Sequence, residues 1–349
     1  MSFRITFVLP HLSLSGGDKV TITYAEGLAR RGHKVTLVHG RFPSSKGRLY
    51  QYLTGRDAKF HRPGPEVDLV PAKGLPADLP AFLPDSDVLI ASWWETVESI
   101  SAAPPSKGTL IHHVQGHEVF PYLPARSASV YRLNVPKIAV SNWLVEILLN
   151  TYGSKDVSLV MNPVDVDRFG WVGRSRLPLP TVGTLFSVTP VKNSAMALAA
   201  VRLARQSLPE LRLTCFGTDQ PPAEWLREPF VSFQLTPRQD VIPGLYRSAD
   251  FWLFTSTSEG FGLPILEAMA VGTPVIGTRA GAAPDLINVN NGALVEHEPE
   301  AMANAIVRLF AKPESSWQKL SRSSRRVAQA HNVDRAVSDF EAVLHAHCR

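Results

Sequence analysis

The sequence of 349 residues lacks any apolar run that approaches the ~20 residues needed for a membrane-spanning helix. It contains only two cysteines, Cys215 and Cys348, which lie far apart and without the spacing of a metal site. The first ten residues carry one basic side chain and enter an alternating apolar pattern, without the apolar core of a signal peptide. These absences predict a cytoplasmic, reduced protein.

Internal repeats, low-complexity tracts and coiled-coil heptads are also missing from the sequence. Hydrophobic residues make up 44% and charged residues 19% of the chain, as in ordinary globular proteins. At ~100–200 residues per domain, the length suggests two domains. No lysine stands out as a pyridoxal phosphate site and no metal site is evident, so we expect neither a metal ion nor another cofactor.

Charge is distributed unevenly along the chain. Residues 1–62 contain eleven basic side chains and three acidic ones, whereas the formal net charge of the whole chain is +5. Scattered basic residues are usually a solvated face, but they also fit peripheral contact with anionic lipid at the inner membrane face, or with a pyrophosphate-bearing acceptor. The sequence has no nucleic-acid-binding motif and no interleaving of basic and aromatic residues, so nucleic acid is not an expected partner.

The first seventy residues begin with a pattern typical of a βαβ unit. A strand is predicted over residues 3–9, a helix over 18–31 and a second strand over 35–38, with Gly16 and Gly17 in the first turn. These glycines either shape the turn or let the backbone approach a phosphate or sugar. The complete Gly-x-Gly-x-x-Gly pattern is absent, which disfavours a nicotinamide cofactor.

Strands and helices are predicted to alternate along the rest of the chain, after an irregular segment at residues 42–86. A boundary is expected near residue 165, because residues 166–180 have no clear periodicity and contain two prolines. The predicted strands cover residues 66–70, 88–92, 110–114, 137–140, 157–160, 181–187, 211–216, 231–235, 251–254 and 274–278. The predicted helices cover residues 93–102, 143–152, 194–206, 240–248, 264–271, 299–310, 315–330 and 333–347. This alternation predicts an α/β fold with parallel sheets.

The most informative stretch is residues 250–281, a strand, a polar glycine-containing loop, a helix and a second strand. Pro264 suits the first position of a helix, and Gly272 suits a left-handed residue just beyond its end. Ligands of open α/β sheets bind at the carboxyl ends of strands, and a helix N-terminus favours phosphate. Glu259 in the loop and Glu267 on the helix add two carboxylates that can accept hydrogen bonds from hydroxyl groups.

The run from Glu259 to Glu267, Glu-Gly-Phe-Gly-Leu-Pro-Ile-Leu-Glu, resembles the Glu-x7-Glu signature of retaining GT-B glycosyltransferases of family 4, or glycosyl transferases group 1. The resemblance continues through Ala-Met-Ala-x-Gly-x-Pro-Val to Gly281, over more than twenty positions. It implies two Rossmann-like domains that face a central cleft, with a C-terminal helix that crosses back to the first domain. The domains would be an acceptor-binding domain at 1–165, a linker at 166–180, a nucleotide-sugar-binding domain at 181–330 and the returning helix at 331–349.

The resemblance also implies roles for individual residues on the donor side. Glu259 would bind the transferred sugar, Glu267 the ribose and Lys192 the diphosphate. The family commonly has an arginine five residues before that lysine, where this sequence has Ser187, so a fixed positive charge is missing. The full set of donor-binding candidates is Gly16, Gly17, Lys192, Gly217, Thr218, Leu235, Glu259, Gly260, Phe261, Gly262, Leu263 and Glu267.

A polar loop follows the predicted strand at 110–114 and contains Gln115, His117 and Glu118. Adjacent histidine and acidic residues are often a hydrogen-bonded surface pair. Similar glycosyltransferases place a histidine, glutamine or acidic residue in this loop, near the donor sugar and the acceptor. We therefore take these three residues as acceptor-side candidates, and Glu259, His117 and Lys192 as the catalytic candidates.

The resemblance implies transfer of a sugar from a nucleotide diphosphate to a hydroxyl of a saccharide or lipid-linked acceptor, with retention of configuration. Synthesis of cell-surface polysaccharide or lipopolysaccharide fits the basic first domain. Two alternatives stay open: a GT-B enzyme of other chemistry, such as a nucleotide-sugar epimerase, and a non-catalytic sugar-binding relative. Product analysis separates these alternatives from sugar transfer.

Overall fold

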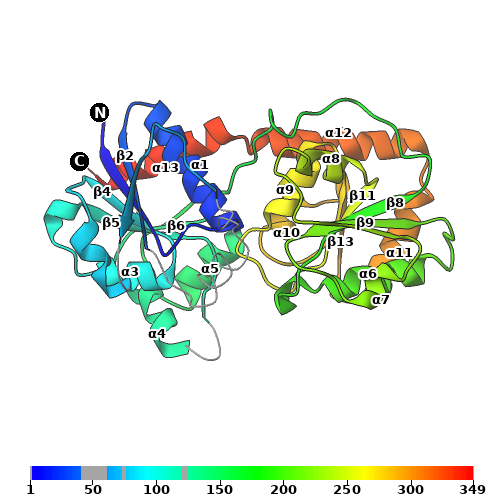
Figure 1. The fold of residues 1–349 in the computed structure, drawn as a ribbon, viewed down its shortest axis with the longest axis horizontal. Helices are drawn as coiled ribbons and strands as arrows, with labels where there is room; N and C mark the ends of the chain where they lie inside the picture. Colours follow the sequence, from blue (N-terminus) through cyan, green and yellow to red (C-terminus); the bar gives the residue numbers. More distant parts are fainter. Residues whose placement is uncertain (1, 41–60, 73–75, 120–123, 349) are drawn as a thin grey trace, which may run out of the picture. The chain divides into compact units, whose positions relative to one another are not determined.

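The computed structural model describes residues 2–40, 61–72, 76–119 and 124–348. The chain divides into two compact units, one formed by Met1–Asn162 with Val333–Arg349 and the other by Pro163–Asn332. Each unit is a parallel sheet with helices on its faces (Figure 1). This confirms the α/β fold with parallel sheets that the alternating pattern predicts, and the two Rossmann-like domains that the family resemblance implies.

The described residues of the first unit form a seven-stranded parallel sheet in the order β3-β2-β1-β4-β5-β6-β7. The strand order reverses between β1 and β4, which marks the switch point where ligands of such sheets bind. The strands are β1 (Arg4–Leu9), β2 (Lys34–Gly40), β3 (Asp68–Ala72), β4 (Val88–Ala91), β5 (Thr109–Val114), β6 (Lys137–Ala139) and β7 (Val157–Leu159). The helices are α1 (Gly16–Arg30), α3 (Trp94–Ile100), α4 (Pro124–Ser129), α5 (Asn142–Asn150) and α13 (Val333–His347).

Helix α13 packs on α1, so the C-terminal helix returns to the first unit as predicted. A Cβ at Gly27 would lie 2.4 Å from Cγ2 of Val337, which shows how closely the two helices approach. Arg31 Nη1 donates to Glu341 Oε2 at 2.8 Å and adds an ion pair at their edge. A side chain at position 27 would therefore require Val337 to shift.

The described residues of the second unit form a six-stranded parallel sheet in the order β10-β9-β8-β11-β12-β13. The strands are β8 (Thr181–Leu185), β9 (Arg212–Gly217), β10 (Val231–Leu235), β11 (Phe251–Phe254), β12 (Val275–Thr278) and β13 (Gly292–Val295). The helices are α6 (Ser194–Ala204), α7 (Ala223–Leu226), α8 (Ile242–Arg247), α9 (Leu263–Ala270), α10 (Ala283–Leu286), α11 (Pro299–Phe310) and α12 (Glu314–Ala330).

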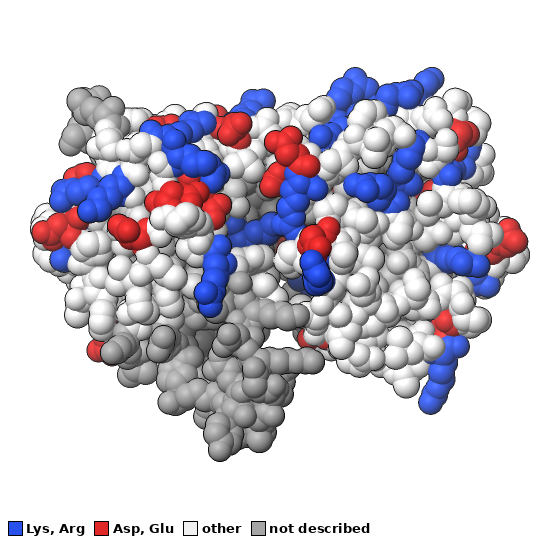
Figure 2. Space-filling view, turned by 45° about the horizontal axis from the view of Figure 1, so that its top comes forward, with Lys and Arg blue, Asp and Glu red and all other residues white. Residues whose placement is uncertain are grey.

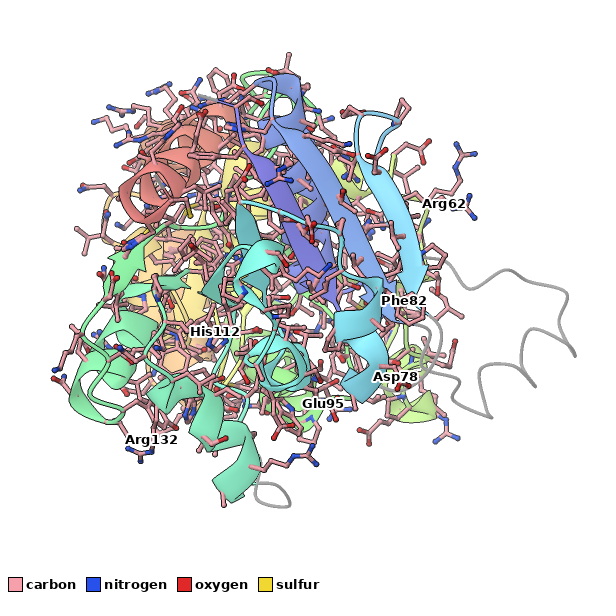
Figure 3. The ribbon with its side chains drawn as sticks, turned by 90° about the vertical axis from the view of Figure 1, so that its left-hand side faces the viewer. Arg62, Asp78, Phe82, Glu95, His112 and Arg132 are labelled. Atoms are coloured by element: carbon pink, nitrogen blue, oxygen red, sulfur yellow. The ribbon has the colours of Figure 1, made fainter. Side chains whose placement is uncertain are left out.

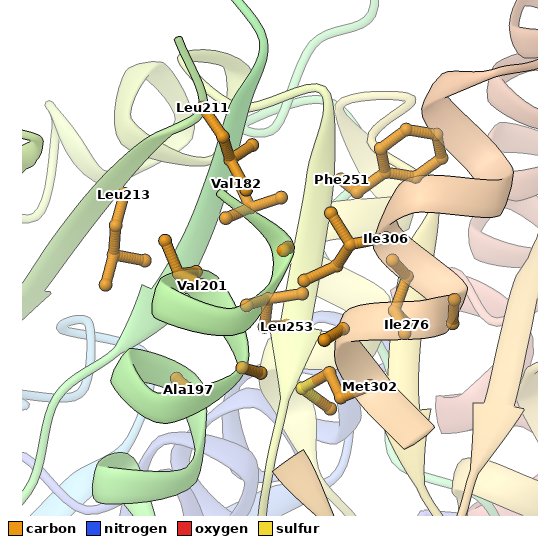
Figure 4. Packing of buried hydrophobic residues seen from close by; sticks show 14 of the residues in the cluster. Val182, Ala197, Val201, Leu211, Leu213, Phe251, Leu253, Ile276, Met302 and Ile306 are labelled. Carbon is orange, nitrogen blue, oxygen red and sulfur yellow. The ribbon is translucent and has the colours of Figure 1, made fainter. Parts of the chain in front are cut away.

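Helices α6 and α11 pack together on one face of this sheet, and their alanine-rich and aliphatic surfaces form its core with β8, β11 and β12 (Figure 4). Val201 of α6 and Ile306 of α11 meet Leu253 of the central strand in this cluster. Helix α12 packs against α9 and adds Trp317 to the same cluster, where Trp317 Nε1 donates to Asp250 O at 3.0 Å. The strands thus lie in a dry core, and their carboxyl ends carry the polar loops.

Several predicted boundaries shift by one or two residues. Helix α1 begins at Gly16 rather than residue 18, because Ser15 takes the N-cap position and its Oγ accepts from Asp18 N at 3.1 Å. Helix α9 begins at Leu263, which places Pro264 at the second position instead of the first. The short helices α4 and α7 were not predicted. Residues 163–180, which include the predicted linker, belong to the second unit and contain no named helix or strand.

Part of the irregular segment predicted at 42–86 lies outside the described residues, as do Arg41, Lys46, Arg48, Arg56 and Lys59. None of the described helices is long and apolar enough to cross a membrane.

Candidate functional site

Two loops of the second unit are joined at the carboxyl ends of neighbouring strands β8 and β11. Thr255 Oγ1 donates to Lys192 O at 2.9 Å, and Thr257 N donates to Val191 O at 2.8 Å. Asn193, just beyond Lys192, has a left-handed backbone with φ of 47°, a conformation that asparagine tolerates better than most residues. The loop that carries Lys192 is therefore held firmly against the loop that leads to Glu259.

Lys192 and Glu259 form an ion pair at the centre of this arrangement. Lys192 Nζ lies 2.5 Å from Glu259 Oε1, and Ser256 Oγ donates to the same oxygen at 2.7 Å. The Lys192 side chain is 30% exposed and that of Glu259 13% exposed, so both can reach a ligand from a half-buried position. The structure thus brings together two of the three predicted catalytic residues, which lie 67 positions apart in sequence.

The start of helix α9 lies beside this pair. Gly262 is its N-cap with φ of 100°, and Pro264 lines the same hollow as Lys192 and Glu259. The first backbone N–H groups of a helix have no partner within it, and they carry the positive end of the dipole. The far end of α9 is as predicted, because Gly272 is left-handed with φ of 77°.

Gly281 explains why the sequence pattern extends beyond the helix. A Cβ at Gly281 would lie 2.5 Å from the carbonyl oxygen of Phe261 and 2.8 Å from Cβ of Glu259. Phe261 is itself buried, and its carbonyl accepts from Ala282 N at 2.8 Å. Gly281 and Ala282 therefore pack against the loop that carries Glu259, Gly260 and Phe261, and support it from behind.

Glu267 has different neighbours from Glu259. Its Oε2 accepts a hydrogen bond from Tyr246 OH at 2.7 Å, and Tyr246 is buried among aromatic side chains. Glu267 is not among the residues that line the hollow around Lys192. The two glutamates are thus presented separately, which fits two different hydroxyl-bearing partners.

Ser187 takes the position where the resemblance leads one to expect arginine. Its Oγ lies 3.2 Å from Asp219 Oδ2, and the same oxygen accepts from Val188 N at 3.1 Å. The sequence reasoning missed Asp219, although its place just after strand β9 is a usual site for functional side chains. A carboxylate therefore lies beside the position where the resemblance implied an arginine, and Lys192 remains the cation predicted for the diphosphate.

The remaining donor candidates of this unit lie at the ends of β9 and β10. Gly217 is required sterically, since a Cβ there would lie 2.2 Å from Phe186 O. Thr218 and Leu235 are exposed at the same edge of the sheet. Gly217 O accepts from Thr236 N at 2.7 Å, so this carbonyl already has a backbone partner.

In the first unit, Gly16 and Gly17 form the first turn of α1. Neither amide donates a hydrogen bond to any residue that the structure describes. Gln115 Nε2 donates to Gly17 O at 3.2 Å and to Thr21 Oγ1 at 3.0 Å. Gln115 therefore positions the start of α1, a role that the sequence did not suggest.

His117 and Glu118 do not pair with each other, so the surface-pair interpretation is wrong. His117 Nε2 lies 2.6 Å from Tyr152 OH, and its ring is surrounded by Tyr131, Trp143 and Tyr152. Glu118 Oε2 accepts from Trp94 N at 2.8 Å. Burial raises the pKa of Glu118 to about 8 and lowers the pKa of His117, so burial favours the neutral form of both side chains.

The interior of the first unit holds two further histidines, His112 and His113 on β5. Both side chains are fully buried, and none of their four ring nitrogens has a hydrogen-bond partner among the described residues. In Figure 3 His112 lies inside the unit, while Arg132 and Arg62 lie toward its periphery. Burial lowers the pKa of each histidine to about 3.

We expect replacement of Gly262 by alanine to disrupt the loop at Glu259. Its φ of 100° is outside the range that alanine favours, and the new Cβ would lie 2.9 Å from the ring of Phe254. The variant should lose about 1–3 kcal/mol of stability, measured by thermal unfolding. Gly244→Ala is the matched control, because Gly244 lies in a helix with no atom within 4 Å of the new Cβ. Equal unfolding temperatures for the two variants would contradict this assignment.

The fold of this protein is similar to that of solved structures of other proteins. HepE of Anabaena, solved in complex with UDP and glucose, superimposes with a TM-score of 0.75 over 99% of this chain and 100% of HepE, at 18% sequence identity. That likeness establishes the fold: the chain is built as a GT-B protein, with two parallel-sheet Rossmann-like domains.

Residues 179–312 match the family described as glycosyl transferases group 1. A GDP-mannose-dependent α-(1-6)-phosphatidylinositol dimannoside mannosyltransferase of Mycobacterium tuberculosis is 35% identical over 105 residues, which are 30% of this chain and 27% of that protein. A D-inositol 3-phosphate glycosyltransferase of Salinispora tropica is 31% identical over 192 residues, 48% of this chain and 39% of that protein. The chain thus spans less than half the length of each of these curated relatives.

The matched segment contains Lys192, Glu259, Glu267 and Ser187. It does not reach Gln115, His117 and Glu118 of the first unit. Similarity to the glycosyltransferase family is therefore concentrated in the part of the chain that carries the donor-side candidates.

Proposed function

We propose that this protein is a glycosyltransferase that moves a sugar from a nucleotide diphosphate to a hydroxyl group of an acceptor, with retention of anomeric configuration. The observation that carries the proposal is the ion pair between Lys192 and Glu259 at the carboxyl ends of β8 and β11. It lies beside the start of α9 and within the segment that matches the glycosyltransferase family. Such a site offers a cation for a diphosphate and a carboxylate for sugar hydroxyls.

In this proposal Lys192 and the amides at the start of α9 neutralise charge that develops on the leaving diphosphate. Glu259 accepts hydrogen bonds from the sugar that is transferred, and Glu267, oriented by Tyr246, accepts them from the ribose. Gly217, Thr218 and Leu235 receive the base through their backbone. The roles of Gly16 and Gly17 toward the diphosphate stay a prediction from the resemblance.

For the chemical step we favour reaction on one face of the sugar. The bond between the anomeric carbon and the diphosphate oxygen breaks, and the acceptor oxygen forms the new bond on the same face. The acceptor proton passes to the leaving diphosphate, so neither Glu259 nor His117 needs to form a covalent intermediate. His117 contacts the sugar or the acceptor, with Gln115 and Glu118 as neighbouring candidates.

The acceptor is proposed to be a saccharide or a lipid-linked sugar. The aromatic side chains around His117, namely Tyr131, Trp143 and Tyr152, resemble the surfaces on which apolar faces of sugars pack. The two curated relatives are named for transfer to phosphatidylinositol dimannoside and to inositol phosphate. A role in glycolipid or cell-surface polysaccharide synthesis fits these observations.

A thermal-shift comparison of UDP, GDP, dTDP and ADP tests the donor site and identifies the base. A ligand present at 100 times its dissociation constant stabilises the folded protein by about 2.7 kcal/mol. We expect one diphosphate to stabilise the protein strongly, and the matching nucleotide sugar to release that diphosphate when an acceptor is added. No stabilisation by any nucleotide would contradict the proposal, and an isomerised donor without transfer would instead indicate an epimerase.

A further inference from the structure

Several basic residues of the first unit form ion pairs. In the first unit Arg4 pairs with Asp87 at 2.7 Å, Arg30 with Glu66 at 3.1 Å and Arg31 with Glu341 at 2.8 Å. Among the described residues of the segment at 1–62, these ion pairs therefore reduce the net positive charge that is left without a partner. The second unit has a surface of basic side chains that form no ion pair with any described residue.

Helix α12 has such a surface on its outer side. Lys319, Arg322 and Arg326 are exposed and make no ion pair with any described residue. At 100° per residue they fall within an arc of about 60° on one side of the helix. The opposite side of α12 is buried through Trp317, Leu320 and Ala328. Figure 2 shows Lys and Arg side chains gathered along the upper edge of the second unit, the edge on which α12 lies in Figure 1.

The carboxylate of α12 does not neutralise this stripe. Glu314 accepts from Arg176 N at 3.1 Å and lies about 100° around the helix from the three basic residues. A fourth basic residue, Arg325, is turned inward and donates to Ala270 O and Val166 O. The three outward cations are thus separate from the residues that hold the helix in place.

An exposed tryptophan lies next to the stripe, and an exposed valine follows it in sequence. Trp171 lines one hollow with Gln318, Ser321 and Arg322. Trp171 is 38% exposed and the adjacent Val172 is 68% exposed. Tryptophan is enriched where proteins meet the headgroup region of a bilayer, and basic residues near an anionic surface contribute about 1 kcal/mol each.

We propose that this surface, formed by Lys319, Arg322 and Arg326 of α12 with Trp171 and Val172, docks on an anionic lipid bilayer. The three cations would lie among the acidic headgroups, and the two apolar side chains would enter the boundary between headgroups and acyl chains. The exposed aliphatic Val172 that follows Trp171 favours a lipid surface, because an aliphatic side chain offers no face on which a base stacks. The inference does not depend on sugar transfer.

Vesicle cosedimentation tests the proposal with the full chain. We expect the protein to bind vesicles of phosphatidylcholine with about 30 mol% phosphatidylglycerol, to bind pure phosphatidylcholine weakly, and to dissociate as salt rises. The triple variant Lys319→Glu, Arg322→Glu and Arg326→Glu should lose at least about tenfold in partition coefficient. The matched control is Arg212→Glu, Arg227→Glu and Arg308→Glu, which reverses the charge of three exposed basic residues outside α12 and should leave binding unchanged.

A second measurement locates the contact. Brominated acyl chains should quench part of the tryptophan fluorescence of the wild type, and Trp171→Phe should remove that part while the protein still binds.

The proposal would be overturned if the α12 triple variant bound vesicles as well as the wild type does, or if the control variant lost as much vesicle binding as the α12 triple variant. It would also be overturned if the protein bound duplex DNA but not vesicles. The fourth such result is sedimentation of the wild type without vesicles that the α12 triple variant abolishes. The last result would indicate contact between copies of the chain.

Discussion

Lys192→Ala should lower kcat/KM for sugar transfer by about 10³-fold while the protein stays folded. Two unit charges about 4 Å apart at an effective dielectric constant of ~20 interact by about 4 kcal/mol, and each 1.36 kcal/mol changes a rate tenfold. The position where an arginine was expected holds Ser187, hydrogen-bonded to Asp219, so no arginine at that position compensates for the loss. The loss should fall mainly on the step in which charge develops on the diphosphate.

Nucleotide binding gives a readout that does not require a known acceptor. The wild type should be stabilised more by the nucleoside diphosphate than by the nucleoside, and Lys192→Ala should abolish most of that difference. Lys312→Ala removes an exposed lysine from the same unit and serves as the matched control. If Lys192→Ala kept more than a tenth of the activity and the full preference for diphosphate, the assignment of this site would be wrong.

Opposite changes in pH-dependent stability are expected from variants of the buried histidines and of Glu118. His112 and His113 have pKa values of about 3 in the folded state, so the unfolded chain binds more protons below pH 6.5. Their contribution to stability is therefore lost as pH falls from about 6.5 toward 3. Burial raises the folded-state pKa of Glu118 to about 8, above the usual value of 4.5, so its contribution to stability is lost as pH rises from about 4.5 toward 8.

When the pH falls from 7.5 to 5, the histidine pair should lower the free energy of unfolding by about 4 kcal/mol, and Glu118 should raise it by about 3 kcal/mol. These terms nearly cancel in the wild type. The double variant His112→Phe and His113→Phe should therefore become more stable on acidification relative to the wild type, and Glu118→Gln less stable. Glutamine keeps an oxygen that can accept from Trp94 N, so the comparison isolates the proton.

Hydrogen exchange of β5 amides measures this effect in the first unit separately from the second. His297→Gln changes an exposed histidine of the second unit and should not alter how the stability of the first unit depends on pH. If the double variant His112→Phe and His113→Phe does not fold, NMR titration of the wild type provides the test, because both buried histidine rings should stay neutral down to pH 5. If the free energy of unfolding depended on pH in the same way for the wild type and Glu118→Gln, the pKa of the Glu118 carboxyl would not be raised by folding.

Local pattern determined the elements of this protein and the class of its fold. The predicted limits of β11, α11 and α13 agree with the structure, because period-2 and period-3.6 patterns and proline or glycine at their ends are local signals. The run from Glu259 to Gly281 likewise identified the loop, the helix and its left-handed end at Gly272. Residue types in such a run are constrained by neighbours a few positions away.

Tertiary structure alone decided which side chains meet. Lys192 and Glu259, 67 positions apart, and Ser187 and Asp219, 32 positions apart, contact each other because parallel strands end at one edge of a sheet. The burial of His112 and His113, the separate partners of His117 and Glu118, and the outward side of α12 follow in the same way from packing. The sequence contained every one of these residues, but their partners depend on non-local contacts, and no local period encodes those.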